Sequence, residues 1–410
     1  MVAATERFTF TGASGGELSA RLDLPVGIPK CFALFAHCFT CTKDIFAASR
    51  IAESLTDKGI AVLRFDFTGL GSSGGEFANS DFSSNVSDLV AAAGHMREHL
   101  AAPEILIGHS LGGSAVLVAA QHIPESRLVA TIGAPADPSQ VAHIFKSSLE
   151  DIERNGEAEV VLAGRPFRIR KQFIEDIKAQ NLDVAVKELK KALLIFHSPT
   201  DRVVSIDNAG QIFQAARHPK SFISLADADH LLSKRADALY VAEIIASWAG
   251  RYISADVPKT EKPPAPVPGS LAVAETGAGK FTNVIVTGSG HILDADEPRS
   301  VGGNDSGPSP YDLLLGALGA CKNITMRMYA DRKNYNLERV EVRLSHDRVH
   351  AEDCAQCETK TGKVDHIRTE IDIVGDLSDE ERQKIFNIAE RCPVHHTLTG
   401  EIFIESLLKK

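Results

Sequence analysis

A serine flanked by glycines is the strongest chemical signal in this sequence. Ser110 stands in Gly108-His-Ser-Leu-Gly112, a G-x-S-x-G pattern, directly after the aliphatic run Ile105–Ile107. A strand that turns abruptly into a helix strains the backbone of its turn residue, and small residues two positions to either side leave room for that turn. The pattern predicts that the Ser110 hydroxyl projects above a sheet as a nucleophile. The alternative is a glycine-rich turn with an incidental serine.

Asp201 and His230 are the acid and the base that such a serine needs. A serine hydroxyl is a poor nucleophile until a base takes its proton and a carboxylate orients that base. Each residue follows an apolar run, and the order serine, acid, histidine is that of the triads at strand ends in α/β sheets. Alone, an aspartate in a turn is usually a cap and a histidine a surface residue, but together the three predict a Ser110–His230–Asp201 triad. Asp227 and Asp229 are weaker rivals for the acid, because they lie too close to the histidine to need a separate strand.

Two backbone amides are expected to hold the oxyanion that acyl transfer creates. One is the N–H of Leu111, directly after the serine, and the other is the N–H of Phe39, in the turn that begins at His37. Cys38 and Cys41 form a C-x-x-C pair in the same turn. We expect two buried structural thiols there, with a redox-sensitive switch as the alternative.

Alternating strands and helices must position these residues. Apolar runs bounded by turn residues predict strands at 31–36, 60–65, 105–107, 128–133, 192–197 and 221–225, after a hairpin over 8–24. Helical spacing predicts helices at 44–58, 83–100, 206–216 and 236–248. This alternation is typical of an α/β fold with a mostly parallel sheet flanked by helices. The insertion 135–191, with a hairpin over 160–169, is predicted to be a small lid above the carboxyl ends of the strands; the alternative is a structural decoration.

A change of composition divides the chain, whose 410 residues are too many for one ordinary core. Five prolines, with lysine and glutamate among them, predict a semi-rigid linker at 255–269. The domains are therefore placed at 1–254 and 270–410. Strands predicted at 271–275, 281–287, 290–295, 340–344, 367–374 and 401–404, with helices at 310–332 and 378–391, make the second domain α+β.

Charge and composition limit the partners of this protein. A net charge of −10 argues against general nucleic-acid binding. No apolar run approaches a membrane span, and residues 1–7 lack the apolar core of a signal peptide. Seven cysteines, an odd number spread over a long chain, favour a reducing compartment over a disulfide scaffold. We expect a cytoplasmic protein with no nucleic-acid or membrane partner.

Residues 1 to about 254 resemble an α/β-hydrolase of the esterase or acyl-hydrolase type. The serine turn, the turn at His37, the loop Asp66–Ser73, Asp201 and His230 carry the resemblance. It implies hydrolysis of a small-molecule ester through an acyl-enzyme, without a cofactor. The family usually has glycine at the second position of the oxyanion turn, where this chain has cysteine.

Cys321 and Cys392 are expected to form a reactive pair in the second domain. Cys321 falls on an apolar stripe of the predicted helix 310–332, which we expect to be buried and which includes Leu314, Ala317, Leu318, Ile324, Thr325 and Met328. Cys392 stands at a helix end, just before Pro393. A cysteine on such a stripe is usually core filler. As a pair, the first thiolate would attack a peroxide oxygen and the second thiol would capture the sulfenic acid as a disulfide.

Residues 270–410 resemble the OsmC/Ohr family of thiol-dependent peroxidases, through the stretches Gly307–Cys321 and Cys392–Leu398. The resemblance implies an intertwined α+β homodimer that reduces an organic hydroperoxide at the expense of a thiol reductant. In the organic-hydroperoxide branch a glutamate ten residues before the first cysteine helps to hold an arginine. Tyr311 stands there in this chain, and Arg299 is a candidate for the arginine.

His346, His350, Cys354 and Cys357 form a further cluster. Their side chains suit a tetrahedral zinc site, but the two histidines fall on an extended segment. A second dithiol and an ordinary surface loop are the alternatives, and no metal is assigned.

Three functions remain open for the fusion. The leading hypothesis is a serine carboxylesterase joined to a hydroperoxide reductase. In the second, the peroxidase is the main activity and the hydrolase is secondary. In the third, the OsmC-like domain is a non-catalytic module that holds two hydrolases together as a dimer.

Overall fold

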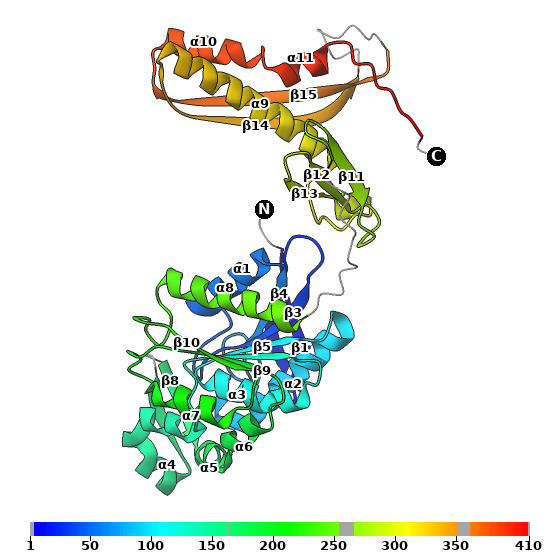
Figure 1. The fold of residues 1–410 in the computed structure, drawn as a ribbon. Coiled ribbons are helices and arrows are strands. Elements are labelled where there is room, and N and C mark those ends of the chain that lie inside the picture. Colours follow the sequence, from blue (N-terminus) through cyan, green and yellow to red (C-terminus); the bar gives the residue numbers. More distant parts are fainter. Residues whose placement is uncertain (1–3, 163–164, 254–265, 351–360, 409–410) are drawn as a thin grey trace. The chain divides into compact units, whose positions relative to one another are not determined.

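The computed structural model describes residues 4–162, 165–253, 266–350 and 361–408, and it divides into two compact units, 1–259 and 260–410 (Figure 1). The predicted linker 255–269 lies largely outside the described residues. None of the described helices combines the length and the apolar character that crossing a membrane requires.

The first unit is built on a sheet of eight strands in the order β1-β2-β4-β3-β5-β6-β9-β10. The first three strands in this order pair antiparallel, and all other neighbours pair in parallel. The bounds are β1 Thr5–Thr11, β2 Glu17–Asp23, β3 Cys31–Ala36, β4 Ile60–Phe65, β5 Ile105–His109, β6 Leu128–Ile132, β9 Ala192–His197 and β10 Lys220–Ser224. This arrangement confirms the predicted α/β hydrolase fold with its leading hairpin.

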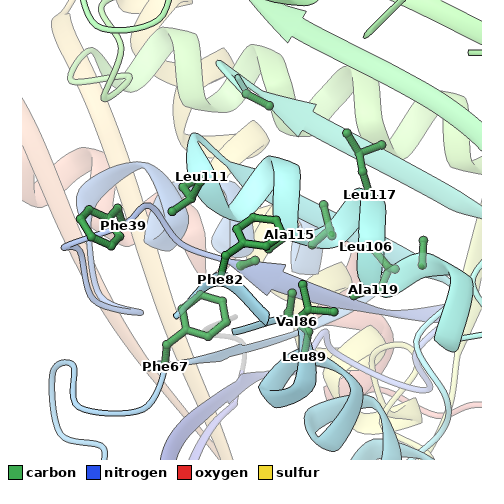
Figure 2. Close-up of a cluster of buried hydrophobic side chains, with 14 of the residues drawn as sticks. Phe39, Phe67, Phe82, Val86, Leu89, Leu106, Leu111, Ala115, Leu117 and Ala119 are labelled. Atoms are coloured by element: carbon green, nitrogen blue, oxygen red, sulfur yellow. The ribbon is translucent and has the colours of Figure 1, made fainter. Parts of the chain in front are cut away.

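Helices cover both faces of the sheet, so successive strand residues enter different cores. On one face α1 (Phe46–Asp57) and α8 (Arg235–Tyr252) pack on Ile105 and Ile107 of β5. On the other face α2 (Phe82–His99) and α3 (Leu111–Ala119) pack on Leu106. Figure 2 shows this second core, with α2 and α3 side chains closing on β5. The helix α7 (Asp207–Ala215) lies between β9 and β10 in the chain.

The insertion between β6 and β9 forms a small structure of its own. Its elements are η3 Pro138–Ser148, α4 Leu149–Asn155, β7 Glu157–Leu162, β8 Arg165–Arg170, α5 Lys171–Ala179 and α6 Leu182–Lys187. The strands β7 and β8 pair antiparallel with Val160 opposite Phe167, which confirms the predicted hairpin. Phe173 and Ile177 of α5 are buried in the same core as α2 and α3. The insertion is therefore packed on the helices of one face of the sheet.

The second unit is α+β, as predicted. An antiparallel sheet of β11 (Leu271–Glu275), β12 (Asn283–Thr287) and β13 (Ile292–Ala295) comes first. The long helix α9 (Pro310–Lys333) and the helix α10 (Asp379–Ala389) then pack with a long hairpin. That hairpin pairs β14 (Asn336–His350) with β15 (Lys363–Asp376), and both strands are longer than predicted.

Two predictions for the second unit are wrong. The buried face of α9 contains Leu318, Met326 and Ala330, whereas Ile324 and Met328 of the predicted stripe are 60% and 66% exposed. Apolar residues surround much of this helix, so packing against the β14–β15 hairpin, and not spacing, selects the buried face. Residues 401–404 form no strand, because no other described strand pairs with them; the chain instead forms the short helix α11 (Pro393–Thr399) before them.

Candidate active site

Ser110 lies in the strained turn between β5 and α3. Its backbone has φ 56° and ψ −126°, outside the regions that a serine prefers, and its N–H donates a 2.8 Å hydrogen bond to the carbonyl of Ile132. A Cβ added at Gly108 would overlap the carbonyl of Gly112, so the turn has no room for a larger residue at either position. The G-x-S-x-G pattern therefore forms the predicted elbow.

The structure brings Ser110, His230 and Asp201 together from three different strand ends. His230 Nε2 lies 3.0 Å from Ser110 Oγ, and His230 Nδ1 lies 2.7 Å from Asp201 Oδ2. A carboxylate only accepts hydrogen bonds, so Nδ1 carries the proton and Nε2 is left as the acceptor for the serine hydroxyl. The arrangement can move a proton from the hydroxyl to the imidazole.

Asp201 is held in its ionised form. Burial by itself raises the pKa of this carboxyl, but the hydrogen bond from His230 and those from the N–H groups of Val204 and Val203 outweigh burial, and the pKa is lowered. The two backbone donors lie 2.9 and 2.8 Å from Oδ1. The rival Asp229 instead accepts a 3.0 Å bond from the N–H of Ser233.

Two further histidines, His109 and His37, are buried beside these residues. Nε2 of His109 lies 2.7 Å from the carbonyl of His230 and thus fixes the loop that carries the base. Burial, assisted by the nearby His230, lowers the pKa of His109 to about 4. Burial likewise lowers the pKa of His37 to about 4. Both imidazoles are therefore neutral near pH 7 and add no positive charge at the site.

The N–H groups of Leu111 and Phe39 are placed for an oxyanion. Leu111 is the first residue of α3, so its N–H has no intrahelical acceptor. Within the described part of the chain, the N–H of Phe39 donates no hydrogen bond. A Cβ at Gly112 would overlap the carbonyl of His37, which shows that the start of α3 and the turn after β3 are in direct contact. Both donors are thus close to the elbow.

The turn that carries Phe39 is closed by a covalent bond. Cys38 and Cys41 form a disulfide with their Cα atoms 5.2 Å apart, and the Cys41 N–H donates a 3.1 Å bond to the Cys38 carbonyl. The prediction of two buried thiols is therefore wrong. A C-x-x-C spacing allows either state, and the turn brings the two sulfurs close enough to be joined.

Charged residues fix the end of this turn. The buried Lys43 donates from Nζ to Asp66 Oδ2 and from its backbone N–H to Asp66 Oδ1, both at 2.6 Å. Arg64, also buried, donates to the Lys43 carbonyl and pairs with Asp23 at 2.8 Å. Every buried charge here has a partner, as burial requires. The network ties the oxyanion turn to the loop that begins at Asp66.

The insertion reaches the same turn. Arg165 of β8 donates a 2.6 Å bond to the Thr40 carbonyl. The ring of Phe39 lies 4.9 Å from that of Phe173 in α5 and 5.5 Å from that of Phe77. The insertion therefore contacts the carboxyl end of β3, where it was predicted to lie. That it acts as a lid remains a prediction.

Cys321 and Cys392 also lie together. The side chain of Cys321 interacts with that of Cys392, which is fully buried at the N-terminus of α11. Burial raises the pKa of the Cys392 thiol and the contact with Cys321 adds to this, whereas the charge of Lys322 opposes it. Lys322 is 2% exposed, and its Nζ lies 2.7 Å from Glu390 Oε1. Both thiols are reduced.

Family models match both parts of the chain. One, described as the alpha/beta hydrolase family, matches residues 33–301, more than half of the chain. The chain belongs to the α/β hydrolase family. A second model, described as OsmC-like protein, matches residues 302–406, so the α/β-hydrolase is fused to an OsmC-like domain. The first match extends into β11–β13, strands that pair with one another and not with the central sheet.

Individual relatives lie in the hydrolase part. The esterase domain of a Rhodothermus marinus protein is 49% identical, with a TM-score of 0.52, and covers 61% of this chain and 100% of its own. Est1E of Butyrivibrio proteoclasticus with bound ferulic acid is 19% identical, with a TM-score of 0.50, and covers 60% of this chain and 99% of its own, which shows the fold alone. Mouse palmitoyl-protein thioesterase ABHD10, mitochondrial, is 28% identical over 198 residues, 46% of this chain and 65% of that protein. The α/β-hydrolase chain thus spans less than two thirds of the mouse protein.

The proposed zinc cluster does not assemble from its histidines. His346 and His350 are four residues apart on β14, which separates them by roughly 13 Å along an extended strand. His346 Nε2 instead lies 3.0 Å from Asp365 Oδ1, and its ring stacks on Tyr311. The two imidazoles cannot bind one ion. Cys354 and Cys357 lie outside the described residues.

Several residues at these sites were missed in the sequence. Gly133 directly follows β6 and has φ 57°, and a Cβ there would lie 3.3 Å from His230 Nδ1. A glycine directly after an apolar strand was its only signal. Lys43, Arg165 and Lys322 gave none, because a single basic residue is ordinarily solvated and only the fold shows its partner.

Proposed function

We propose that the first unit is a serine carboxylesterase that works through an acyl-enzyme. The observation that carries the proposal is the continuous contact from Ser110 Oγ through His230 to Asp201. The strained φ of Ser110 supports it independently, since such strain is retained where it serves a function.

The chemistry follows from these contacts. Ser110 Oγ attacks the ester carbonyl while its proton passes to His230 Nε2, and Asp201 stabilises the imidazolium. The oxyanion accepts hydrogen bonds from the N–H groups of Leu111 and Phe39. The imidazolium then protonates the leaving alcohol, and a water activated by the same base releases the acid.

Relatives support this reaction class without fixing the substrate. The esterase domain from Rhodothermus marinus favours an oxygen ester, whereas the mouse thioesterase keeps a thioester as the alternative. A graded series of nitrophenyl and aryl esters and thioesters compares the two.

Ser110→Ala is the decisive variant. We expect it to abolish hydrolysis of the series, because no other hydroxyl contacts His230 within the described residues. Ser87→Ala is the matched control, because this exposed serine of α2 hydrogen-bonds only to its own helix. Hydrolysis that survives Ser110→Ala, or an inactive wild type, would refute the assignment.

For the second unit we propose reduction of organic hydroperoxides by Cys321 and Cys392. The Cys321 thiolate attacks the terminal oxygen of the hydroperoxide, the O–O bond breaks, and the leaving alkoxide takes up the proton that the thiol gave up, becoming the alcohol. Cys392 then attacks the sulfenic acid, forming a disulfide and releasing water. A thiol reductant returns two electrons and two protons. The raised pKa of Cys392 suits the resolving role, since this thiol stays protonated until the sulfenic acid forms.

Lys322 is proposed to supply the positive charge that this site needs. Lys322 follows Cys321 in α9, and its charge also acts on Cys392. Its buried side chain is held by a hydrogen bond to Glu390. Tyr311, which occupies the position of the expected glutamate, stacks on His346 and supports no arginine in the described residues. Arg299 lies in the turn η4 and remains only a candidate.

The alternative is that the OsmC-like domain serves only to dimerise. Exposed apolar side chains favour a homodimer: Ile324 and Met328 on α9, and the segment 402–408, where Phe403 is 89% and Leu408 95% exposed. Hydroperoxide consumption that is lost in Cys321→Ser supports the peroxidase. Dimerisation without any turnover supports the scaffold.

The two activities are proposed to serve one purpose, the detoxification of oxidised esters in the cytoplasm. The motivation is the fusion of the two domains alone. If separately expressed domains acted on such esters as fast as the intact chain, this hypothesis would lose its support.

A further inference from the structure

We propose that Cys38 and Cys41 are a reversible disulfide that controls the hydrolase by holding the oxyanion turn. The inference rests on the proposed esterase function and deepens it. The bond joins the residues on either side of Phe39 and Thr40. It therefore closes a covalent ring around the residue whose N–H is assigned to the oxyanion.

The ring of Phe39 packs against Phe77 and Phe173, but few hydrogen bonds hold the backbone of the turn. His37 Nδ1 lies 2.8 Å from the Cys38 carbonyl, and the Cys41 N–H bonds to the same oxygen. Thr40 is contacted by the exposed side chain of Arg165. These bonds act on carbonyls, and no described hydrogen bond fixes the N–H of Phe39 itself. The disulfide adds a covalent restraint to the backbone on both sides of that donor.

The unequal exposure of the two cysteines leads us to expect a reducible bond. Cys38 is buried, at 6% exposed, whereas Cys41 is partly exposed. We therefore expect a reducing thiolate to attack from the Cys41 side, with Cys38 leaving as a thiolate that then takes up a proton. Cys31, the first residue of β3, is also buried, and its burial raises its pKa to about 12.

The exchange balances with a low-molecular-weight disulfide as oxidant. The Cys38 and Cys41 thiols give up two protons and two electrons, a bond forms between their sulfurs, and the S–S bond of the oxidant breaks to give two thiols. In the dithiol form the turn keeps its charged anchor between Lys43 and Asp66. The fold therefore persists, while the Phe39 donor becomes less ordered.

Oxidation is expected to activate ester hydrolysis. Loss of a whole oxyanion donor lowers kcat by about 100- to 1,000-fold, so a donor that is present but less ordered should lower it by roughly tenfold. KM should change little, because the donor acts mainly on the transition state.

The test measures kcat and KM of the full chain in buffers with graded ratios of oxidised to reduced glutathione. In parallel, alkylation and peptide mass mapping report the state of the 38–41 pair alone, separately from the other cysteines. We expect kcat of the wild type to rise about tenfold as this pair oxidises. The double variant Cys38→Ser/Cys41→Ser should stay at the reduced level in every buffer, with wild-type circular dichroism.

Several outcomes would overturn the inference. If kcat stays constant while mapping shows that the pair passes from dithiol to disulfide, the disulfide does not regulate the hydrolase. The proposed esterase function would be unaffected by this result. If the pair never oxidises although the enzyme is active, the regulation is likewise refuted and the esterase function is not. A misfolded double variant leaves the wild-type titration and Cys41→Ser as the test. A wild type without ester hydrolysis in any buffer refutes the proposed function as well.

Discussion

Hydrogen bonds hold the individual side chains of the proposed triad in place. Asp201 uses one oxygen for His230 and the other for two backbone N–H groups. His109 holds the carbonyl of His230 while staying neutral. The imidazole of His230 can therefore rotate little, and its Nδ1–H donates to Asp201.

Asp201→Asn should separate the acid from its rival. An amide in place of the carboxylate favours the wrong tautomer of His230, and we expect kcat to fall by about 10³- to 10⁴-fold. Asp229→Asn should change kcat less than about twofold, because its carboxylate caps Ser233. Ester hydrolysis measures both. A larger loss in Asp229→Asn would reverse the assignment.

Buried neutral histidines make stability depend on pH. His109 and His37 have a pKa of about 4 in the folded protein, below the value of about 6.5 of an exposed histidine. As the pH falls, these histidines bind protons first in the unfolded chain. Their contribution to the free energy of unfolding is therefore fully present above about pH 6.5 and decreases toward pH 4.

His109→Gln should weaken this pH dependence, because glutamine can still donate to the His230 carbonyl but does not titrate. His122→Gln, at an exposed position, is the control and should behave as the wild type. The free energy of unfolding is measured by urea titration at pH 7.0, 6.0 and 5.0, in steps of about one pH unit across the range in which it should decrease. Equal slopes in all three proteins would contradict the prediction.

At the scale of elements, the contact between α3 and the turn after β3 allows no side chain. Gly112→Ala would place its Cβ on the carbonyls of His37 and Ala36, so we expect a loss of about 2 kcal/mol or more together with most of the esterase activity. The thermal midpoint at which hydrolysis is lost measures it.

Gly94→Ala is the matched control within α2. Nothing lies within 4 Å of a Cβ at this position, and alanine favours a helix over glycine by about 1 kcal/mol. This variant should therefore raise the midpoint. If Gly112→Ala were equally stabilising, the close contact at the elbow would be wrong.

Over the whole molecule, each unit has its own core, so the two chemistries should be separable. Ser110→Ala should leave hydroperoxide consumption at the wild-type rate, and Cys321→Ser should leave ester hydrolysis unchanged. Ester hydrolysis and hydroperoxide consumption are each measured for both variants. Loss of both activities in either variant would indicate coupling that separate cores do not predict.

Assembly is expected to depend on the exposed face of α9. If the proposed homodimer uses this face, replacing Ile324 and Met328 by aspartate should convert it into a monomer, because charge is then placed on apolar surface that the second copy would cover. Val184→Asp, an exposed apolar position of α6 in the first unit, is the control. Sedimentation velocity distinguishes the two. A double variant that remains dimeric would move the interface elsewhere.

The parts of this protein that depend on local order could be predicted from its sequence. Strands buried on both faces are continuous apolar runs, so β3, β4, β5, β6 and β9 were found almost to the residue. The elbow depends only on steric limits within a few residues, so the G-x-S-x-G pattern was enough to predict the position of Ser110. Parallel strands end at one edge of a sheet, so Asp201 and His230 could be expected to meet the serine there.

Only the tertiary structure decided the features that depend on what lies opposite a residue. It selected the Leu318–Met326 face of α9 from several apolar faces, and it left 401–404 without a partner strand. It also joined Cys38 to Cys41 and gave the buried Lys322 its carboxylate. Sequence spacing fixes the direction of a side chain relative to its own element, but burial, charge pairing and cross-linking depend on a second element that spacing does not specify.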